Sequence, residues 1–220
     1  MRPAPPGPVP AALDLCRSLL AYEGAGRELV ARIKYRNDRG ALAWLAGGMA
    51  ALVEPPPGAV VTWAPTSARR RRRRGFDQAQ LLAAAVSRRW HVPCRRLLDR
   101  APGPAQTGLA LDARRQGPSF VPAPAPRSRP VPGHGRGKRL SVPVIVVDDV
   151  VTTGSTLTAA AWALRATGAP WVSALTAART PRTMEARGIP TPSLPLSVPA
   201  APPDVETLLK FRGQPADVQQ

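Results

Sequence analysis

The sequence predicts an α/β fold in which a parallel sheet is flanked by helices. Three runs of apolar residues, at 59–63, 144–147 and 171–177, are typical of strands that are buried on both faces. Segments with the apolar spacing of helices lie between these runs. Because strands and helices alternate along the chain, we expect right-handed βαβ units and a parallel sheet.

Local patterns give the other elements. Residues 13–22 fit either a helix or a short extended segment, and the sequence leaves this open. Helices are expected at 27–35, at 40–53, from Asp77 to about 90, and at 157–166. Asn37 or Asp38 can cap the second of these and Asp77 the third, because their short side chains accept hydrogen bonds from the first turn.

Less regular segments complete the organisation. A short strand is expected at 94–98, a strand fragment at 120–121, and an arginine-rich loop before Asp77. Prolines dominate residues 1–11, which we expect to be disordered, and residues 181–220, which we expect to form a tail. The folded domain should then span 12–180, with a Pro/Gly-rich hood or linker at about 101–140.

Composition excludes several classes of protein. Of the 220 residues 44% are hydrophobic, which is enough for a core, and the sequence has no run of 18 apolar residues for a transmembrane helix. The proline-broken start does not resemble a signal peptide. Cys16 and Cys94 lie too far apart for a C-x-x-C pair, so neither zinc nor a disulfide framework is expected. A cytoplasmic location follows by default.

The net charge of +17 is consistent with an anionic partner, either nucleic acid or a phosphorylated substrate. Heavy use of Ala, Pro, Arg and Gly is also typical of GC-rich coding sequence, so the charge alone establishes neither kind of partner. Six consecutive arginines follow the strand at 59–63 and the residues Ala64, Pro65 and Thr66. Such a run can face pyrophosphate, a nucleic acid strand, or only solvent.

The most informative motif joins the strand at 144–147 to the helix at 157–166. Asp148 and Asp149 come first, and a short loop rich in hydroxyl groups follows, which contains Thr152, Thr153, Gly154, Ser155 and Thr156. Backbone N–H groups of such a loop and of the helix start bind phosphate, while adjacent carboxylates suit sugar hydroxyls or Mg²⁺. The motif therefore predicts a ribose phosphate site. The simpler alternative is that the acidic pair caps the next helix.

This segment resembles the 5-phosphoribosyl-1-pyrophosphate (PRPP) signature of type I phosphoribosyltransferases. Further blocks over residues 15–180 occur in the order seen in the ComF family, of which 74–79 (Arg-Gly-Phe-Asp-Gln-Ala) is the most diagnostic. The others are Tyr22-Glu23-Gly24, residues 33–36 with Asp38, Gln106 with Leu109 and Arg114, and Gly168. The chain departs from this family because it lacks a four-cysteine zinc ribbon, has a Pro/Gly-rich segment at 122–139, and extends beyond 180.

The resemblance implies a type I phosphoribosyltransferase fold and assigns roles. Asp148 and Asp149 would bind the ribose hydroxyls, directly or through Mg²⁺, and carry the catalytic role. Residues 152–156 would cradle the 5′-phosphate, and Ala64, Pro65, Thr66 and Arg74 would meet pyrophosphate. The remaining arginines, which are Arg69, Arg70, Arg71, Arg72 and Arg73, would bind nucleic acid.

The resemblance also implies a role in natural transformation, where ComF-family proteins are associated with single-stranded DNA and the competence machinery. Whether catalysis occurs stays open, and so does pairing into a homodimer. One alternative is a catalytic phosphoribosyltransferase of nucleobase salvage, and another is a nucleic-acid-binding protein with a vestigial PRPP loop. No Phe or Tyr lies beside the signature in the sequence, so no aromatic partner for a base is evident.

Overall fold

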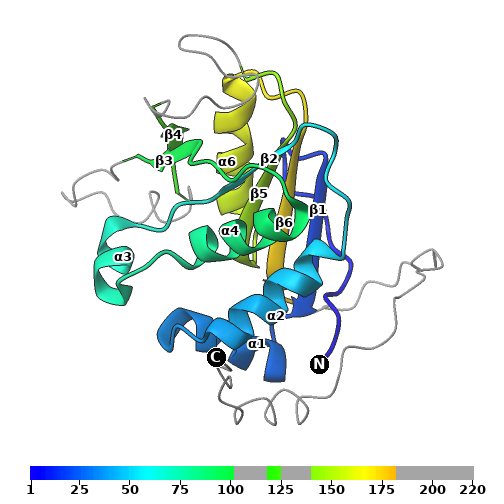
Figure 1. Ribbon diagram of the computed structural model, residues 1–220, viewed down its shortest axis with the longest axis vertical. Helices are drawn as coiled ribbons and strands as arrows, with labels where there is room; N and C mark the ends of the chain where they lie inside the picture. The colour runs from blue at the N-terminus through cyan, green and yellow to red at the C-terminus, as the bar shows by residue number, and fades with distance from the viewer. Residues whose placement is uncertain (102–117, 125–139, 182–220) are drawn as a thin grey trace, which may run out of the picture. The chain divides into compact units, whose positions relative to one another are not determined.

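The computed structural model describes residues 1–101, 118–124 and 140–181 (Figure 1). Four parallel strands form one sheet in the order β1-β6-β5-β2, and β3 pairs with β4 in a separate antiparallel sheet. The strands are β1 (Leu15–Ala21), β2 (Val60–Trp63), β3 (Leu98–Arg100), β4 (Phe120–Pro122), β5 (Val144–Val151) and β6 (Val172–Arg179). The predicted parallel α/β architecture is confirmed.

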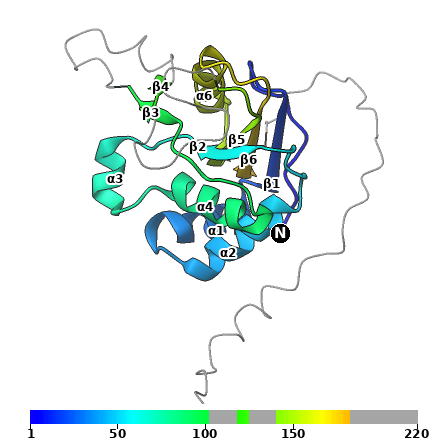
Figure 2. The same cartoon turned by 45° about the horizontal axis from the view of Figure 1, so that its top comes forward.

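Helices cover both faces of the parallel sheet. They are α1 (Gly24–Tyr35), α2 (Arg39–Ala50), α3 (Ala68–Arg74), α4 (Gln78–Trp90) and α6 (Ser155–Ala166). Figure 2 shows α6 on one side of the sheet and α1, α2 and α4 on the other. Along β5, Val144 and Val146 join the core beneath α6, while Ile145 and Val147 join the core beneath the other three helices. Successive side chains of a strand point to opposite faces, so one strand supplies both cores.

The predicted helix caps are confirmed. Asp38 Oδ1 accepts a hydrogen bond from the Ala41 amide at 3.0 Å, so Asp38 rather than Asn37 begins α2. Asp77 Oδ1 accepts from the Ala79 amide at 3.1 Å and begins α4. Both contacts satisfy backbone donors that a helix leaves free at its first turn.

The arginine-rich segment is a helix, α3, so the predicted loop is wrong there. Ser67 caps it by accepting a hydrogen bond from the Arg70 amide at 3.3 Å, and Gly75 ends it with φ +79°. Arginine is a good helix former, and glycine at the end tolerates the left-handed conformation. A favourable cap at each end therefore outweighs the repulsion between neighbouring guanidinium groups.

The structure also decides the conformation of residues 13–22 and corrects the prediction for residues 94–98. Residues 13–22, which were left open, contain strand β1, paired with β6. The strand predicted at 94–98 does not form, because Cys94 makes only one bridge to Val61 before the chain continues into β3. The expected tail and most of the expected linker lie outside the described residues, as do Gln106, Leu109 and Arg114.

The N-terminal segment was expected to be disordered, but the structure places it along β1. The Ala4 amide donates to the Leu19 carbonyl at 3.1 Å, and the Ala21 amide donates to the Arg2 carbonyl at 3.1 Å. The physical reason is that β1 is an edge strand with free backbone groups, and a proline-rich segment is tolerated beside an edge. We call residues 2–10 the N-terminal strap.

In the described parts of the chain, no helix is long and apolar enough to cross a membrane.

The two faces of α6 offer a test of the core. Leu164 is 1% exposed and packs beneath the helix, whereas Trp162 of the same helix is 61% exposed. Replacing Leu164 by alanine should lower the free energy of unfolding by about 2–5 kcal/mol, because the substitution leaves a cavity. The matched Trp162→Ala variant should change it by no more than about 0.5 kcal/mol. Urea denaturation measures both values, and equal losses would contradict this packing.

Candidate functional site

The predicted site residues meet at the carboxyl edge of the parallel sheet. Trp63 of β2 lies opposite Val147 of β5, and the Ala64 amide donates to the Val147 carbonyl at 3.2 Å. Residues 64–66 therefore begin beside Asp148, although the two segments lie far apart in the sequence. Ligands of open α/β sheets bind at this edge.

The acidic pair does not cap the helix that follows it. Asp148 and Asp149 lie within β5, and the N-cap of α6 is Gly154, with no side-chain capping bond. The alternative in which these carboxylates serve only as a helix cap is therefore wrong. Instead, the Asp149 amide donates to Asp148 Oδ1 at 2.8 Å, and Asp149 Oδ2 lies 3.1 Å from Lys34 Nζ.

Lys34 belongs to the block at 33–36, but the sequence assigned it no role in the site. Its side chain comes from α1 and is 16% exposed, while that of Asp149 is 18% exposed, so water screens this ion pair little. The same ammonium group lies 5.8 Å from the centre of the Tyr22 ring, at the end of β1. An aromatic side chain therefore does lie close to the acidic pair, which sequence proximity alone could not reveal.

A third carboxylate, Asp77, ties the loop after β2 to α4. Asp77 is 6% exposed, and its Oδ2 accepts a hydrogen bond from the Thr66 amide at 2.9 Å. Burial raises the pKa of Asp77, the backbone amides that it binds oppose this rise, and the negative charge of Asp149 adds to it. Asp77 was predicted as a helix cap but not as part of the site.

Asp148 carries the largest electrostatic perturbation in the site. Burial raises its pKa well above the ordinary value, and the charge of Asp149 raises it further. The Asp149 amide and Lys34 act in the opposite direction, while Asp77 adds to the rise. Of these three carboxylates only Asp149 forms an ion pair with a described residue, and an additional cation or hydroxyl donors would be stabilised beside them.

The two carboxylates fit Mg²⁺, which often takes one or two protein carboxylates and completes its shell with ligand phosphates and water. No group of three or more His, Cys, Asp or Glu side chains could hold a metal within the described ranges. An ion held here would therefore need oxygen atoms from a bound ligand or from water as well as from Asp148 and Asp149.

Arg74 differs from the other arginines of α3, because it is partly buried and they are exposed. Its Nη1 donates to Gln78 Oε1 at 2.8 Å, and its guanidinium lies 5.3 Å from the centre of the Tyr35 ring. Arg74 Nε and Gln78 Nε2 are buried without a hydrogen-bond partner among the described residues. Unsatisfied buried donors cost free energy, so an anionic ligand that accepts from them would be favoured.

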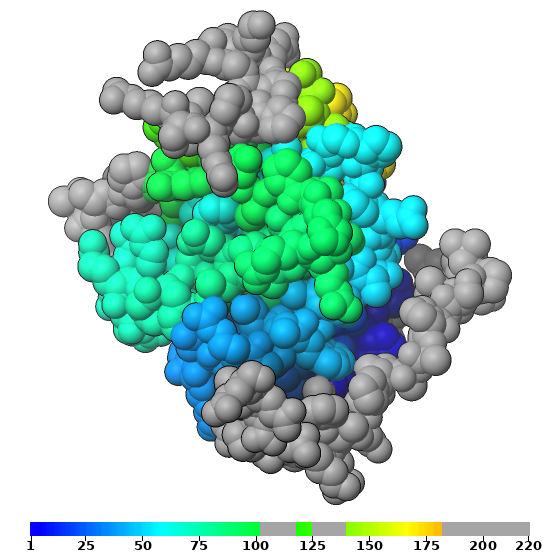
Figure 3. All heavy atoms as spheres, viewed as in Figure 1, coloured from blue at the N-terminus to red at the C-terminus, as the bar shows by residue number. Residues whose placement is uncertain are grey.

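The five preceding arginines, Arg69 to Arg73, are exposed on the surface of α3. In the space-filling view α3 projects beside the end of α1 (Figure 3). Arg100 of β3 joins this charged region: burial lowers its pKa, the charge of Arg70 lowers it further, and Asp148 opposes both. Sequence reasoning missed Arg100, because no motif surrounds it.

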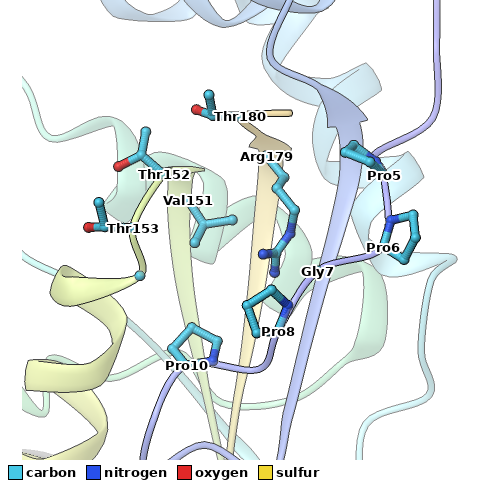
Figure 4. Close-up of a pocket in the computed structure, with 11 residues that line it drawn as sticks. Pro5, Pro6, Gly7, Pro8, Pro10, Val151, Thr152, Thr153, Arg179 and Thr180 are labelled. Carbon is cyan, nitrogen blue, oxygen red and sulfur yellow. The ribbon is translucent and has the colours of Figure 1, made fainter. Parts of the chain in front are cut away.

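The loop after β5 presents hydroxyl groups to solvent. Thr152, Thr153 and Ser155 are exposed, whereas Gly154 is buried with φ +83°. Figure 4 shows the hydroxyls of Thr152 and Thr153 pointing away from the N-terminal strap. Thr156 lies in the first turn of α6, whose N-terminus adds a positive dipole end.

Comparisons with known proteins were made by family, by sequence and by structure, and the similarity that they give is distant. A scan against protein-family models finds no match, and no curated protein matches the chain. The chain is similar to the crystal structure of a purine phosphoribosyltransferase from Pyrococcus horikoshii, at 14% identity and a TM-score of 0.32, over 81% of this chain and 99% of that one. A similarity this weak supports no inference about function.

The raised pKa of Asp148 gives a test by pH. A carboxyl whose pKa is raised on folding favours the folded state at low pH, and this contribution is lost as pH rises through the folded-state pKa. The Asp148→Asn variant should therefore be more stable than the parent at pH 7, and the gain should shrink toward about pH 3, below the usual Asp pKa. Thermal denaturation across this range measures the difference.

The exposed Glu28 provides the control, because Glu28→Gln removes the same charge from the surface of α1. It should show no comparable gain. A stability loss at pH 7 in Asp148→Asn would contradict the inferred electrostatic cost.

Proposed function

We propose that this chain binds PRPP or a closely related ribose phosphate at the carboxyl edge of its parallel sheet, as a protein of the phosphoribosyltransferase class. The observation that carries the proposal is the position of Asp148 and Asp149. They lie between the loop that follows β2 and the hydroxyl-rich loop that follows β5. The ribose of PRPP lies between the 5′-phosphate and the pyrophosphate. Asp148 and Asp149 would therefore accept hydrogen bonds from the ribose hydroxyls, while the two loops would bind the phosphate groups on either side.

Each part of the ligand then has a partner. Asp148 and Asp149 accept from the ribose hydroxyls, and residues 152–156 with the start of α6 bind the 5′-phosphate. Residues 64–66 and Arg74 face pyrophosphate, where the free donors of Arg74 and Gln78 favour an acceptor. Mg²⁺, held by the two aspartates together with ligand oxygens, would neutralise negative charge on pyrophosphate.

Lys34 has a part in this scheme. In the ligand-free chain the Lys34 ammonium neutralises Asp149, and this ion pair lowers the electrostatic cost of the neighbouring buried carboxylates. When a ribose phosphate binds, the Lys34 ammonium can remain on Asp149 or turn toward a phosphate oxygen, since the lysine side chain is long and flexible. Either position keeps a positive charge beside the ligand.

We further propose that the chain is ComF-like, with a role in handling single-stranded DNA during natural transformation. The resemblance of residues 74–79 supports the family, and the exposed arginines of α3 support a polyanionic partner. The proximity of Tyr22 to the acidic pair favours a second candidate, a catalytic phosphoribosyltransferase of nucleobase salvage, because a base can stack on an aromatic ring.

The ribose phosphate proposal is tested by calorimetric titration of PRPP with Mg²⁺. The parent should bind, and Asp149→Asn should bind at least about tenfold more weakly, since it loses one charged hydrogen bond worth about 1.5–3 kcal/mol. Glu28→Gln serves again as the surface control and should bind like the parent. Absence of binding by the parent, or equal affinity of Asp149→Asn, would refute the proposal.

The DNA proposal is tested by the salt dependence of binding to a single-stranded oligonucleotide. Arg72→Gln/Arg73→Gln removes two charges from α3, and Arg88→Gln/Arg89→Gln removes two exposed charges from α4. The α3 variant should lower the slope of log K against log salt by about 1.4, the value for two lost phosphate contacts with a single strand. Equal slopes for the parent and both variants would exclude α3 as the DNA surface.

A further inference from the structure

The N-terminal strap covers a cavity on the side of the hydroxyl-rich loop that faces β6 and β1. The cavity has a volume of about 50 Å³ and lies between the strap, the loop after β5 and the end of β6 (Figure 4). Its lining includes Gly7 and Pro10 of the strap, residues 151–154 at and after the end of β5, and Arg179 and Thr180 at the end of β6. No acidic side chain of the described residues lines it.

Two glycines allow the strap to lie this close. A Cβ atom at Gly154 would lie 2.8 Å from Pro10 Cγ, and a Cβ atom at Gly7 would lie 2.6 Å from Arg179 Nη1. Both distances are shorter than a van der Waals contact between heavy atoms. The strap therefore packs directly against the start of α6 and against the Arg179 guanidinium, and forms one wall of the cavity.

Arg179 is a buried cation that has no anionic partner among the described residues. It is 7% exposed, and its one side-chain hydrogen bond to a described residue runs from Nη2 to Cys16 Sγ at 3.3 Å. Burial raises the pKa of the Cys16 thiol, so this thiol is neutral at pH 7 and supplies no negative charge. No carboxylate of the described residues forms an ion pair with Arg179, and a buried charge without a partner is costly.

One further group favours negative charge in the same cavity. Gly154 is the N-cap of α6, so the positive end of the helix dipole lies at the cavity wall. The hydroxyl of Thr180 points away from the Arg179 guanidinium (Figure 4). A guanidinium and a helix N-terminus are donors with which proteins bind oxyanions.

We propose that this cavity is a binding site for a single tetrahedral oxyanion, such as inorganic phosphate, held by Arg179 and the start of α6 under the N-terminal strap. The volume is several times the 10–15 Å³ that one water molecule needs, so one phosphate fits but a sugar phosphate does not. The site shares the loop and the start of α6 with the proposed PRPP site but lies on the strap side of the loop, whereas the hydroxyls of Thr152 and Thr153 point away from the strap.

Calorimetric titration of inorganic phosphate into the full chain tests the proposal. The parent should bind phosphate, and Arg179→Gln should bind it about tenfold or more weakly, because a charge-assisted contact is lost. Arg17→Gln is the matched control, since Arg17 lies next to Cys16 on β1 but is exposed and does not line the cavity. It should keep the parent affinity.

A second variant closes the cavity and leaves the charge in place. Gly7→Val should abolish phosphate binding, because its side chain would occupy the space of the Arg179 guanidinium. Val9→Ala, at an exposed position of the same strap, should not change the affinity. Circular dichroism establishes that each variant is folded, so one informative variant remains if the other fails to fold.

The possible outcomes separate this site from the proposed PRPP site. Loss of phosphate binding in Arg179→Gln or Gly7→Val, with PRPP binding retained, would support the oxyanion site. No phosphate binding by the parent would overturn it, as would unchanged affinity in a folded variant of either kind. A phosphate affinity that falls in Thr156→Val but not in Arg179→Gln would place the anion in the hydroxyl-rich loop and would also overturn it.

Discussion

The parallel pairing of β5 with β2 on one side and β6 on the other is the constraint on which the rest of the structure depends. Strand β5 alternates its side chains between the two cores and carries the acidic pair in its second half. Since Val147 lies opposite Trp63, the last residue of β2, the loop after β2 leaves the sheet at the level of Asp148, whereas β5 and β6 stay paired as far as Val151 and Arg179. A shift of β5 by one residue would exchange its core-facing side chains and displace the carboxylates together.

Charge is distributed unevenly over this edge. Asp77, Asp148 and Asp149 interact electrostatically, and among the described residues only Asp149 of the three forms an ion pair, with Lys34. Most of the positive charge of the chain lies elsewhere, including the exposed arginines of α3. The acidic cluster is therefore not a means of stabilising the fold, because desolvation and mutual repulsion make it costly. Such a concentration of perturbed groups is more readily explained by ligand binding.

The edge strand β1 links the strap to the site. Because β1 has a free backbone edge, the proline-rich segment pairs with it and reaches the start of α6. Pro10 covers Gly154 on one side of the loop, while Thr152 and Thr153 are exposed on the other. The loop thus has a covered side and an accessible side, and the two sides present different chemistry.

The sequence by itself determined the architecture and the groups at the end of β5. The apolar runs, the caps at Asp38 and Asp77, and the acidic pair with its loop are local features, and local patterns are sufficient to locate them. Only the tertiary structure decided which distant groups meet there. Lys34 and Tyr22 reach the acidic pair through the packing of α1 and β1, and no spacing in the sequence encodes that contact. The same holds for the strap, because proline content suggests disorder until a neighbouring edge strand provides hydrogen-bond partners.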